Sequence, residues 1–148
     1  MAFRIFSPAF AEGASIPPLF TCSGADVSPS LEWSGEPKEA RGFALIVDDP
    51  DAPHGVWTHW LLYDIPLATH TLPQGSTAIG TAGANDFGKR AYGGPCPPAG
   101  APHRYYFKLY ALDVASLGLS PGAKRAELDA VLNEHVLAEA QYMGRFQR

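Results

Sequence analysis

Asp49 and His59 are polar side chains that adjoin or interrupt apolar segments. Phe43–Asp48 and Trp57–Asp64 have the pattern of two strands, with Asp49 following the first and His59 inside the second. A short connection would bring this carboxylate and this imidazole together. A carboxylate that accepts a hydrogen bond from an imidazole fixes its tautomer and favours its charged form. The pair therefore indicates a site rather than an ordinary fold element.

The segment Tyr92–Tyr110 offers a second set of candidates, because a glycine- and proline-rich loop runs there into a strand pattern. Side chains alternate between the two faces of a strand. Alternation places four side chains on one face of this strand: His103, Tyr105, Phe107 and Leu109. It also predicts one shared face for four side chains of the earlier strand: Trp57, His59, Leu61 and Tyr63. The two histidines are then expected to line one pocket.

With these motifs the chain resembles the phosphatidylethanolamine-binding proteins, which include the Raf kinase inhibitor proteins, and most closely their bacterial and archaeal branch. The resemblance rests on Asp49-Pro50-Asp51-Ala52-Pro53, the His59 strand, Gly93–Pro98 and His103-Arg104-Tyr105. Weaker agreement extends from Ser7–Phe10 to Met143–Phe146. The resemblance implies a two-sheet Greek-key fold with a C-terminal helix, binding of phospholipid head groups, and inhibition of kinases or serine proteases. It also implies a cis Ala52–Pro53 bond.

The composition of the chain limits its possible domain organisation, partners and cellular compartment. The 148 residues, 46% of them hydrophobic, suit one domain spanning residues 1–148. A formal charge of −4 argues against nucleic acid or an acidic membrane as a partner. No apolar run approaches the ~20 residues of a membrane span, and the first residues do not look like a secretory signal. Two cysteines fit a reducing cytoplasm, so a Cys22–Cys96 disulfide is not expected.

Fourteen prolines and fifteen glycines divide the chain into short segments, which is typical of an all-β domain. Further strands are expected at Phe3–Ser7, Leu31–Ser34 and Arg104–Leu112. Within the predicted strands, Leu45, Leu61 and Leu109 are expected to face inward. The segment Thr69–Pro102 is expected to be an ordered loop over the pocket. Ser120 is a candidate N-cap for a helix reaching about Tyr142, with a break near Asn133 and a short strand as an open alternative. The predicted fold is a mainly β, two-sheet antiparallel β-sandwich with a C-terminal helical segment.

The expected pocket residues are Asp49, Pro53, Trp57, His59, Gly94, Cys96, Pro97, His103 and Tyr105. Asp49 should point inward, while Asp48 or Asp51 caps backbone donors, because three clustered carboxylates repel one another unless they are hydrogen-bonded. Cys96 is expected to be a small packed thiol and not a nucleophile. The other histidines (His54, His70 and His135) are expected to lack comparable partners.

These residues favour a binding protein over an enzyme, with an anion such as phosphate, phosphoethanolamine or acetate as ligand and no cofactor. A kinase or protease target and a homodimer are open partner hypotheses. The alternative is a hydrolase or metal enzyme that uses Asp49, His59 and His103. No HExxH or Gly-x-Ser-x-Gly motif supports that alternative. A pure interaction module would leave the histidine–aspartate cluster unexplained.

Overall fold

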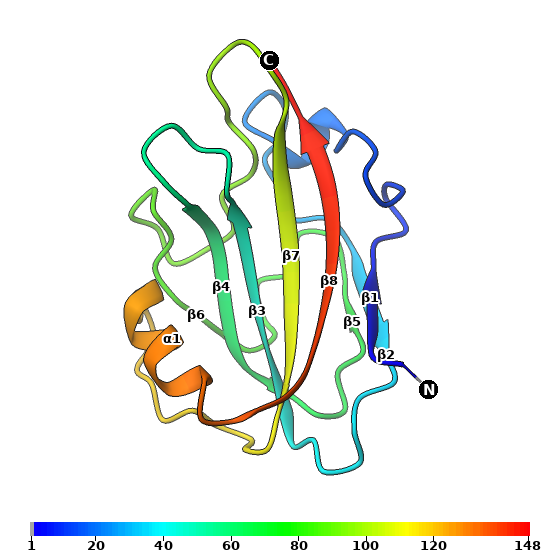
Figure 1. Ribbon diagram of the computed structural model, residues 1–148, viewed down its shortest axis with the longest axis vertical. Coiled ribbons are helices and arrows are strands. Elements are labelled where there is room, and N and C mark those ends of the chain that lie inside the picture. Colours follow the sequence, from blue (N-terminus) through cyan, green and yellow to red (C-terminus); the bar gives the residue numbers. More distant parts are fainter. Residues whose placement is uncertain (1) are drawn as a thin grey trace.

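The computed structural model describes residues 2–148 as two antiparallel sheets and one short α-helix (Figure 1). The smaller sheet has the order β1 (Arg4–Phe6), β2 (Leu31–Ser34), β5 (Thr71–Leu72). The larger sheet has the order β6 (Thr81–Ala82), β4 (Trp57–Pro66), β3 (Gly42–Asp49), β7 (His103–Leu112), β8 (Val136–Phe146). The helical elements are a 3-10 turn at Pro18–Phe20 and α1 at Arg125–Leu132. This confirms the predicted mainly β, two-sheet fold.

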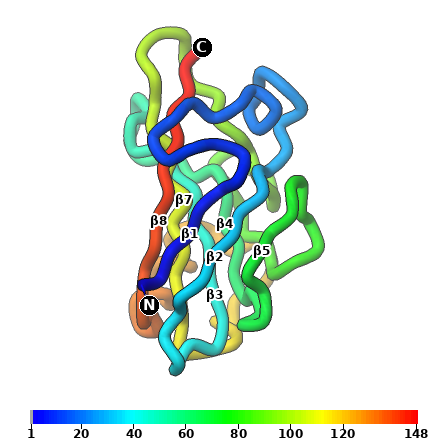
Figure 2. Tube along the Cα trace, turned by 90° about the vertical axis from the view of Figure 1, so that its right-hand side faces the viewer, coloured from blue at the N-terminus to red at the C-terminus, as the bar shows by residue number. Residues whose placement is uncertain are grey.

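The main core lies between the two sheets, which Figure 2 shows one in front of the other. Its centre is a group of side chains that are at most 3% exposed: Leu31, Trp33, Phe43, Leu45, Phe107 and Leu109. Alternation along β3 and β7 sends every second residue into this layer. Phe43 also packs edge-on against Trp33, with ring centroids 5.5 Å apart.

A second, smaller core lies on the opposite face of the larger sheet, under α1 (Figure 1). It joins the sheet residues Ile46, Leu61 and Tyr63 to the helix residues Leu128 and Leu132. The large sheet is thus covered on both faces, so β3 and the middle of β4 are buried almost throughout. Burial on both faces explains why simple alternation was a poor guide in β4.

A β-bulge at His59 corrects the predicted face assignment of β4. Val47 pairs with Trp60, but the next residue, Asp48, pairs with Thr58, which leaves His59 as the extra residue. A bulge of this kind shifts the alternation by one position. Leu61 therefore faces the helix, together with Tyr63, whereas Leu45 and Leu109 face the other sheet as predicted.

The C-terminal region is also different from the expectation. The helix is capped by Lys124, whose N–H donates to the Glu127 side chain at 3.1 Å, and not by Ser120. It ends at Leu132, so the prediction of a helix reaching about Tyr142 is wrong; a strand is present, but it begins at Val136, inside the predicted helix, and β8 has 11 residues. Its inward positions recur every second residue and pair with β7 along its whole length. The helical spacing of apolar residues continues to Leu137, but the pairing of β8 with β7 from Val136 onward overrides it.

One expected loop region contains two short strands. β5 and β6 both lie inside Thr69–Pro102, each with two residues, and the remainder of that segment is irregular. Across residues 2–148, no helix has both the length and the apolar character that crossing a membrane would require.

Candidate functional site

A pocket of about 200 Å³ opens at one end of the large sheet, at the top in Figure 1. There the β3–β4 turn meets the irregular segment before β7. Eight of the nine predicted residues line it: Asp49, Pro53, Trp57, His59, Cys96, Pro97, His103 and Tyr105. Pro98, at the end of the Gly94–Pro98 backbone that was also expected to form the pocket, lines it too, whereas Ala52 and Phe87 were missed by sequence reasoning. We call this cavity the His59–His103 pocket.

Asp49 holds His103 at the pocket. The Nδ1 of His103 donates to Asp49 Oδ2 at 2.6 Å, which is the predicted contact between this carboxylate and one imidazole. Asp49 is only 3% exposed, and its Oδ1 accepts from the Asp51 N–H at 2.7 Å. Because Nδ1 carries the proton toward Asp49, the Nε2 of His103 is left for a ligand.

Asp51 fastens the β3–β4 turn to β7. Its carboxylate accepts from the Arg104 N–H at 2.9 Å and pairs with the Arg104 guanidinium at 2.8 Å, as expected for a carboxylate that caps a backbone donor. The hydrogen bond from that guanidinium lowers the pKa of Asp51 to about 2. The predicted cis Ala52–Pro53 bond is wrong, because no peptide bond among residues 2–148 is cis. The Asp49 and Asp51 hydrogen bonds hold this turn with a trans bond.

His59 is fixed by the backbone of Gly93. Its Nδ1 donates to the Gly93 carbonyl at 2.7 Å, and the Gly93 N–H donates back to the His59 carbonyl at 3.0 Å. A carbonyl can only accept, so the neutral ring has its lone pair on Nε2. Burial lowers the pKa of His59, although the Gly93 carbonyl partly opposes this. Burial therefore favours the neutral form of His59.

Tyr105 brings an unsatisfied hydroxyl to the same pocket. The residue is 1% exposed, and its ring packs edge-on against His59 with centroids 5.2 Å apart. The hydroxyl finds no hydrogen-bond partner among residues 2–148. Burial raises the pKa of Tyr105, so the group is a neutral donor. A buried donor of this kind gains from a ligand that can accept its hydrogen bond.

Cys96 is neither a free packed thiol nor a nucleophile, because it forms a disulfide with Cys22 across 74 positions of sequence. The argument from compartment was therefore wrong for this pair. Cys22 also donates its N–H to the Pro95 carbonyl at 3.1 Å. The disulfide and this hydrogen bond join the wall of the pocket to the segment that follows the 3-10 turn.

Gly94 is the one predicted site residue that does not line the pocket. Its N–H donates to Asp26 at 2.8 Å, and a Cβ there would lie 2.2 Å from the Phe20 carbonyl oxygen. Close packing therefore explains the glycine. The neighbouring carbonyl of Gly93 matters more, and its contact with His59 had no local sequence signal.

Two histidines that were expected to lack partners have them. His70 Nε2 contacts Glu36 at 2.9 Å, and His135 Nδ1 contacts Asp113 at 2.8 Å. Both pairs lie outside the His59–His103 pocket, so they add nothing to it. No group of three or more His, Cys, Asp or Glu side chains within residues 2–148 is arranged to hold a metal ion.

The fold and site define a two-sheet β protein with a small histidine-lined pocket at one end. The family model described as phosphatidylethanolamine-binding protein matches residues 6–147, and the chain belongs to that family. An Aquifex aeolicus relative, designated a UPF0098 protein, is 47% identical over 98% of this chain and 88% of its own length.

Two solved structures are similar throughout. CT736 of Chlamydia trachomatis, described as a homologue of phosphatidylethanolamine-binding protein, superposes with a TM-score of 0.93 at 38% identity. The match covers 99% of this chain and 98% of CT736. YbcL of E. coli, described as a member of the mammalian family, gives 0.94 at 31% identity over 100% and 99% of the two chains. These matches support the assignment of the chain to the bacterial and archaeal branch of the family.

Proposed function

We propose that the His59–His103 pocket binds a small oxyanion, with the phosphate of a phosphoethanolamine-type head group as the preferred class. The observation that carries this proposal is the unsatisfied Tyr105 hydroxyl beside two imidazoles whose Nδ1 atoms are already engaged. Each ring therefore has only Nε2 to offer, and a protonated ring would donate to an anion from that atom.

Asp49 is proposed to act through His103 and not by touching the ligand. A carboxylate repels a phosphate, but Asp49 is 3% exposed and its Oδ2 already accepts from His103. With Nδ1 directed at Asp49, a protonated His103 would form a charge-assisted hydrogen bond to the anion through Nε2. Such bonds are roughly twice as strong as neutral ones.

Titration calorimetry with phosphoethanolamine from about pH 5.5 to 8.5 tests this proposal, because the range brackets the ordinary histidine pKa of about 6.5. We expect affinity to fall as pH rises, since protonated imidazoles are lost. His103→Ala should abolish most binding. Asp49→Asn keeps one acceptor oxygen but removes the charge and the second of the two acceptors that now serve His103 and the Asp51 N–H, so it should weaken binding. His70→Ala, outside the pocket, is the matched control. Constant affinity over this range, or tighter binding by Asp49→Asn, would contradict the mechanism.

The variant Tyr105→Phe tests whether the Tyr105 hydroxyl contributes to ligand binding. Loss of a hydrogen bond to a charged ligand should weaken binding by about 1.5–3 kcal/mol, which is tenfold or more in Kd. The same change removes an unsatisfied polar atom from the empty protein, so the unliganded variant should be no less stable. An unchanged Kd would show that the hydroxyl takes no part in binding.

We also propose that the protein is a binding protein and not an enzyme. The candidate nucleophile, Cys96, is held in a disulfide, and no other pocket residue is a serine, threonine or lysine. Purified protein should hydrolyse simple esters and phosphomonoesters only at the background rate.

Inhibition of a kinase or serine protease is a further proposal that the family alone supports, as is a homodimer. The cytoplasmic location stays a proposal, and the Cys22–Cys96 disulfide argues against it, because disulfides persist mainly in oxidising compartments.

A further inference from the structure

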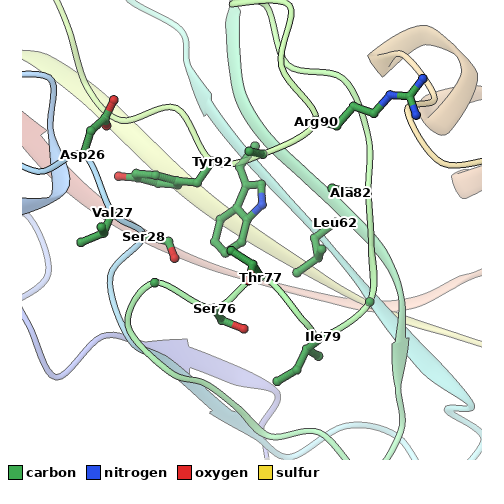
Figure 3. Close-up of a pocket in the computed structure, with 14 residues that line it drawn as sticks. Asp26, Val27, Ser28, Leu62, Ser76, Thr77, Ile79, Ala82, Arg90 and Tyr92 are labelled. Atoms are coloured by element: carbon green, nitrogen blue, oxygen red, sulfur yellow. The ribbon is translucent and has the colours of Figure 1, made fainter.

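A second cavity, of about 260 Å³, lies beside β4 and has no part in the proposed anion site (Figure 3). Its walls come from β4, from the segment around Asp26–Ser28 and from the loop 75–80. The residues that matter for its chemistry are Asp26, Ser28, Trp60, Thr77, Arg90 and Tyr92. It combines two aromatic rings with hydroxyl groups and one carboxylate.

Trp60 and Tyr92 form an aromatic corner in this cavity. Their ring centroids are 5.4 Å apart and the planes meet at 85°. Trp60 is only 3% exposed, and the Tyr92 hydroxyl donates to the Phe20 carbonyl at 2.7 Å, so both rings are held in place. Burial raises the pKa of Tyr92, so its phenol is neutral. Fixed aromatic faces attract cations through the negative face of the ring.

The charges around the cavity also favour a cation. Among the described residues, Asp26 is the one acidic residue that lines the cavity; it is exposed, and its Oδ1 accepts from the Gly94 N–H at 2.8 Å. Arg90 is the one basic residue among the described residues that line the cavity, but its guanidinium points away toward the helix (Figure 3). Its atoms lie where a Cβ on Gly122 would be, which fixes that orientation.

We propose that this cavity binds a small organic cation, an ammonium group with short carbon substituents. The aromatic corner would hold the carbon substituents, and the Asp26 carboxylate would offset the positive charge. The volume of about 260 Å³ lies just below the usual range for drug-sized ligands, roughly 300–1,000 Å³. A small ligand fits such a volume, since a cavity of about 150 Å³ can hold benzene.

The proposed cation site is separate from the His59–His103 pocket. Trp60 and Tyr92 line the cation cavity, whereas the neighbouring residues His59 and Gly93 are bonded to each other at the other pocket. The two cavities thus use neighbouring residues of β4, but they share no lining residue. This inference does not depend on the anion proposal, and His103→Ala should leave cation binding unchanged.

Two-dimensional ¹H–¹⁵N NMR with tetramethylammonium chloride tests the inference, with ionic strength held constant by sodium chloride. We expect saturable shifts of the Trp60 indole N–H and the Gly94 amide at millimolar concentrations. tert-Butanol is the neutral analogue of similar shape, and it should bind at least about threefold more weakly because it lacks the charge. Both signals report on the cavity directly.

Asp26→Asn is the sharpest variant, because its amide oxygen can still accept from the Gly94 N–H while the charge is removed. It should weaken tetramethylammonium binding at least about threefold and leave tert-butanol binding unchanged. Glu39→Gln removes one negative charge from an exposed residue outside the cavity and should change neither. The proposal is overturned if no saturable shift appears below about 100 mM, if tert-butanol binds equally well, or if Asp26→Asn has no effect.

Discussion

Asp48 and Asp49 are neighbours on β3, are both almost fully buried, and serve opposite faces of the same sheet. Asp48 Oδ2 accepts from Lys108 at 3.1 Å and pairs with Arg125 at 3.2 Å, which are two permanent cations. Asp49 pairs instead with His103, a titratable group at an open pocket. A carboxylate held by fixed charges supports the structure, whereas one held by an imidazole can respond to a ligand or to pH.

The same contrast extends to the surroundings of the two residues. The Asp48 face is covered by α1 through the small apolar core. The Asp49 end is built from turns and loops, which a disulfide and side-chain hydrogen bonds hold together. We therefore expect changes on the helix face to alter mainly stability, and changes at the pocket end to alter mainly ligand affinity.

Leu61→Ala should give the largest loss of stability on the helix face. Leu61 is 0% exposed and packs in the core beneath α1. Truncation of such a leucine costs about 2–5 kcal/mol of unfolding free energy. Phosphoethanolamine affinity of the folded variant should be unchanged. Urea unfolding and calorimetry check the two effects, and Leu67→Ala at a 39% exposed leucine is the control. A weakened affinity would show that the two faces are coupled.

Joint replacement of Cys22 and Cys96 by serine should lower both the free energy of unfolding and the affinity for phosphoethanolamine. A disulfide that closes a loop of this length contributes typically 2–4 kcal/mol, with a strongly context-dependent range of about 0–5. Affinity should also fall, because Cys96 and the adjoining prolines form a wall of the pocket. Reduction of the wild type by a dithiol should reproduce the effect. If native protein reacts with a thiol-alkylating reagent before any reduction, the bond is not closed in solution.

Asp48→Ala should destabilise the protein without weakening ligand binding. Loss of one partner from a buried pair costs about 3–5 kcal/mol. A value of about 1–3 kcal/mol is more reasonable here, because both cations are about a quarter exposed and can be hydrated. The Asp48 Oδ1 also lacks a partner among residues 2–148, which reduces what the carboxylate contributes. Asp49→Ala is the comparison variant and should show the reverse pattern, with the larger loss in affinity.

Local signals predicted the parts of this molecule that depend on neighbouring residues. Short patterns predicted the strands at Phe43–Asp48 and Trp57–Asp64, the alternation that places Tyr105 and Phe107 inward, and the contact of Asp49 with one imidazole. The two sheets follow from the dense glycine and proline punctuation. The identity of the family added the overall arrangement.

Contacts between distant segments could not be predicted in this way. The bulge at His59 depends on how β3 and β4 are registered, and the sequence around it is an unbroken strand pattern. The disulfide joins positions 74 residues apart, and the cysteine count alone favoured free thiols. The helix ended early because pairing of β8 with β7 outweighed a weak helical spacing. Each miss reflects tertiary structure overriding a local preference.

The smallest expected effect is a pH dependence of stability that comes from His59. Its pKa is lowered in the folded protein, chiefly by burial, whereas the unfolded chain has the ordinary value of about 6.5. Below that value the unfolded chain binds the proton more readily, so unfolding free energy should fall as pH decreases from about 7.5 to 5.5. His59→Gln retains a donor for the Gly93 carbonyl but does not titrate, so it should lose less stability over that range.

Phosphoethanolamine should reduce this loss in the wild type, because a bound anion favours the protonated imidazole that burial disfavours. Urea unfolding at several pH values, with and without ligand, measures both effects. His54→Gln, at an exposed histidine that follows Pro53 but does not itself line the pocket, reports the effect of removing a histidine from the surface. Equal pH slopes for the wild type and His59→Gln would mean that His59 is not held neutral. The contrast between a fixed Asp48 face and a titratable pocket end would then rest on His103 alone.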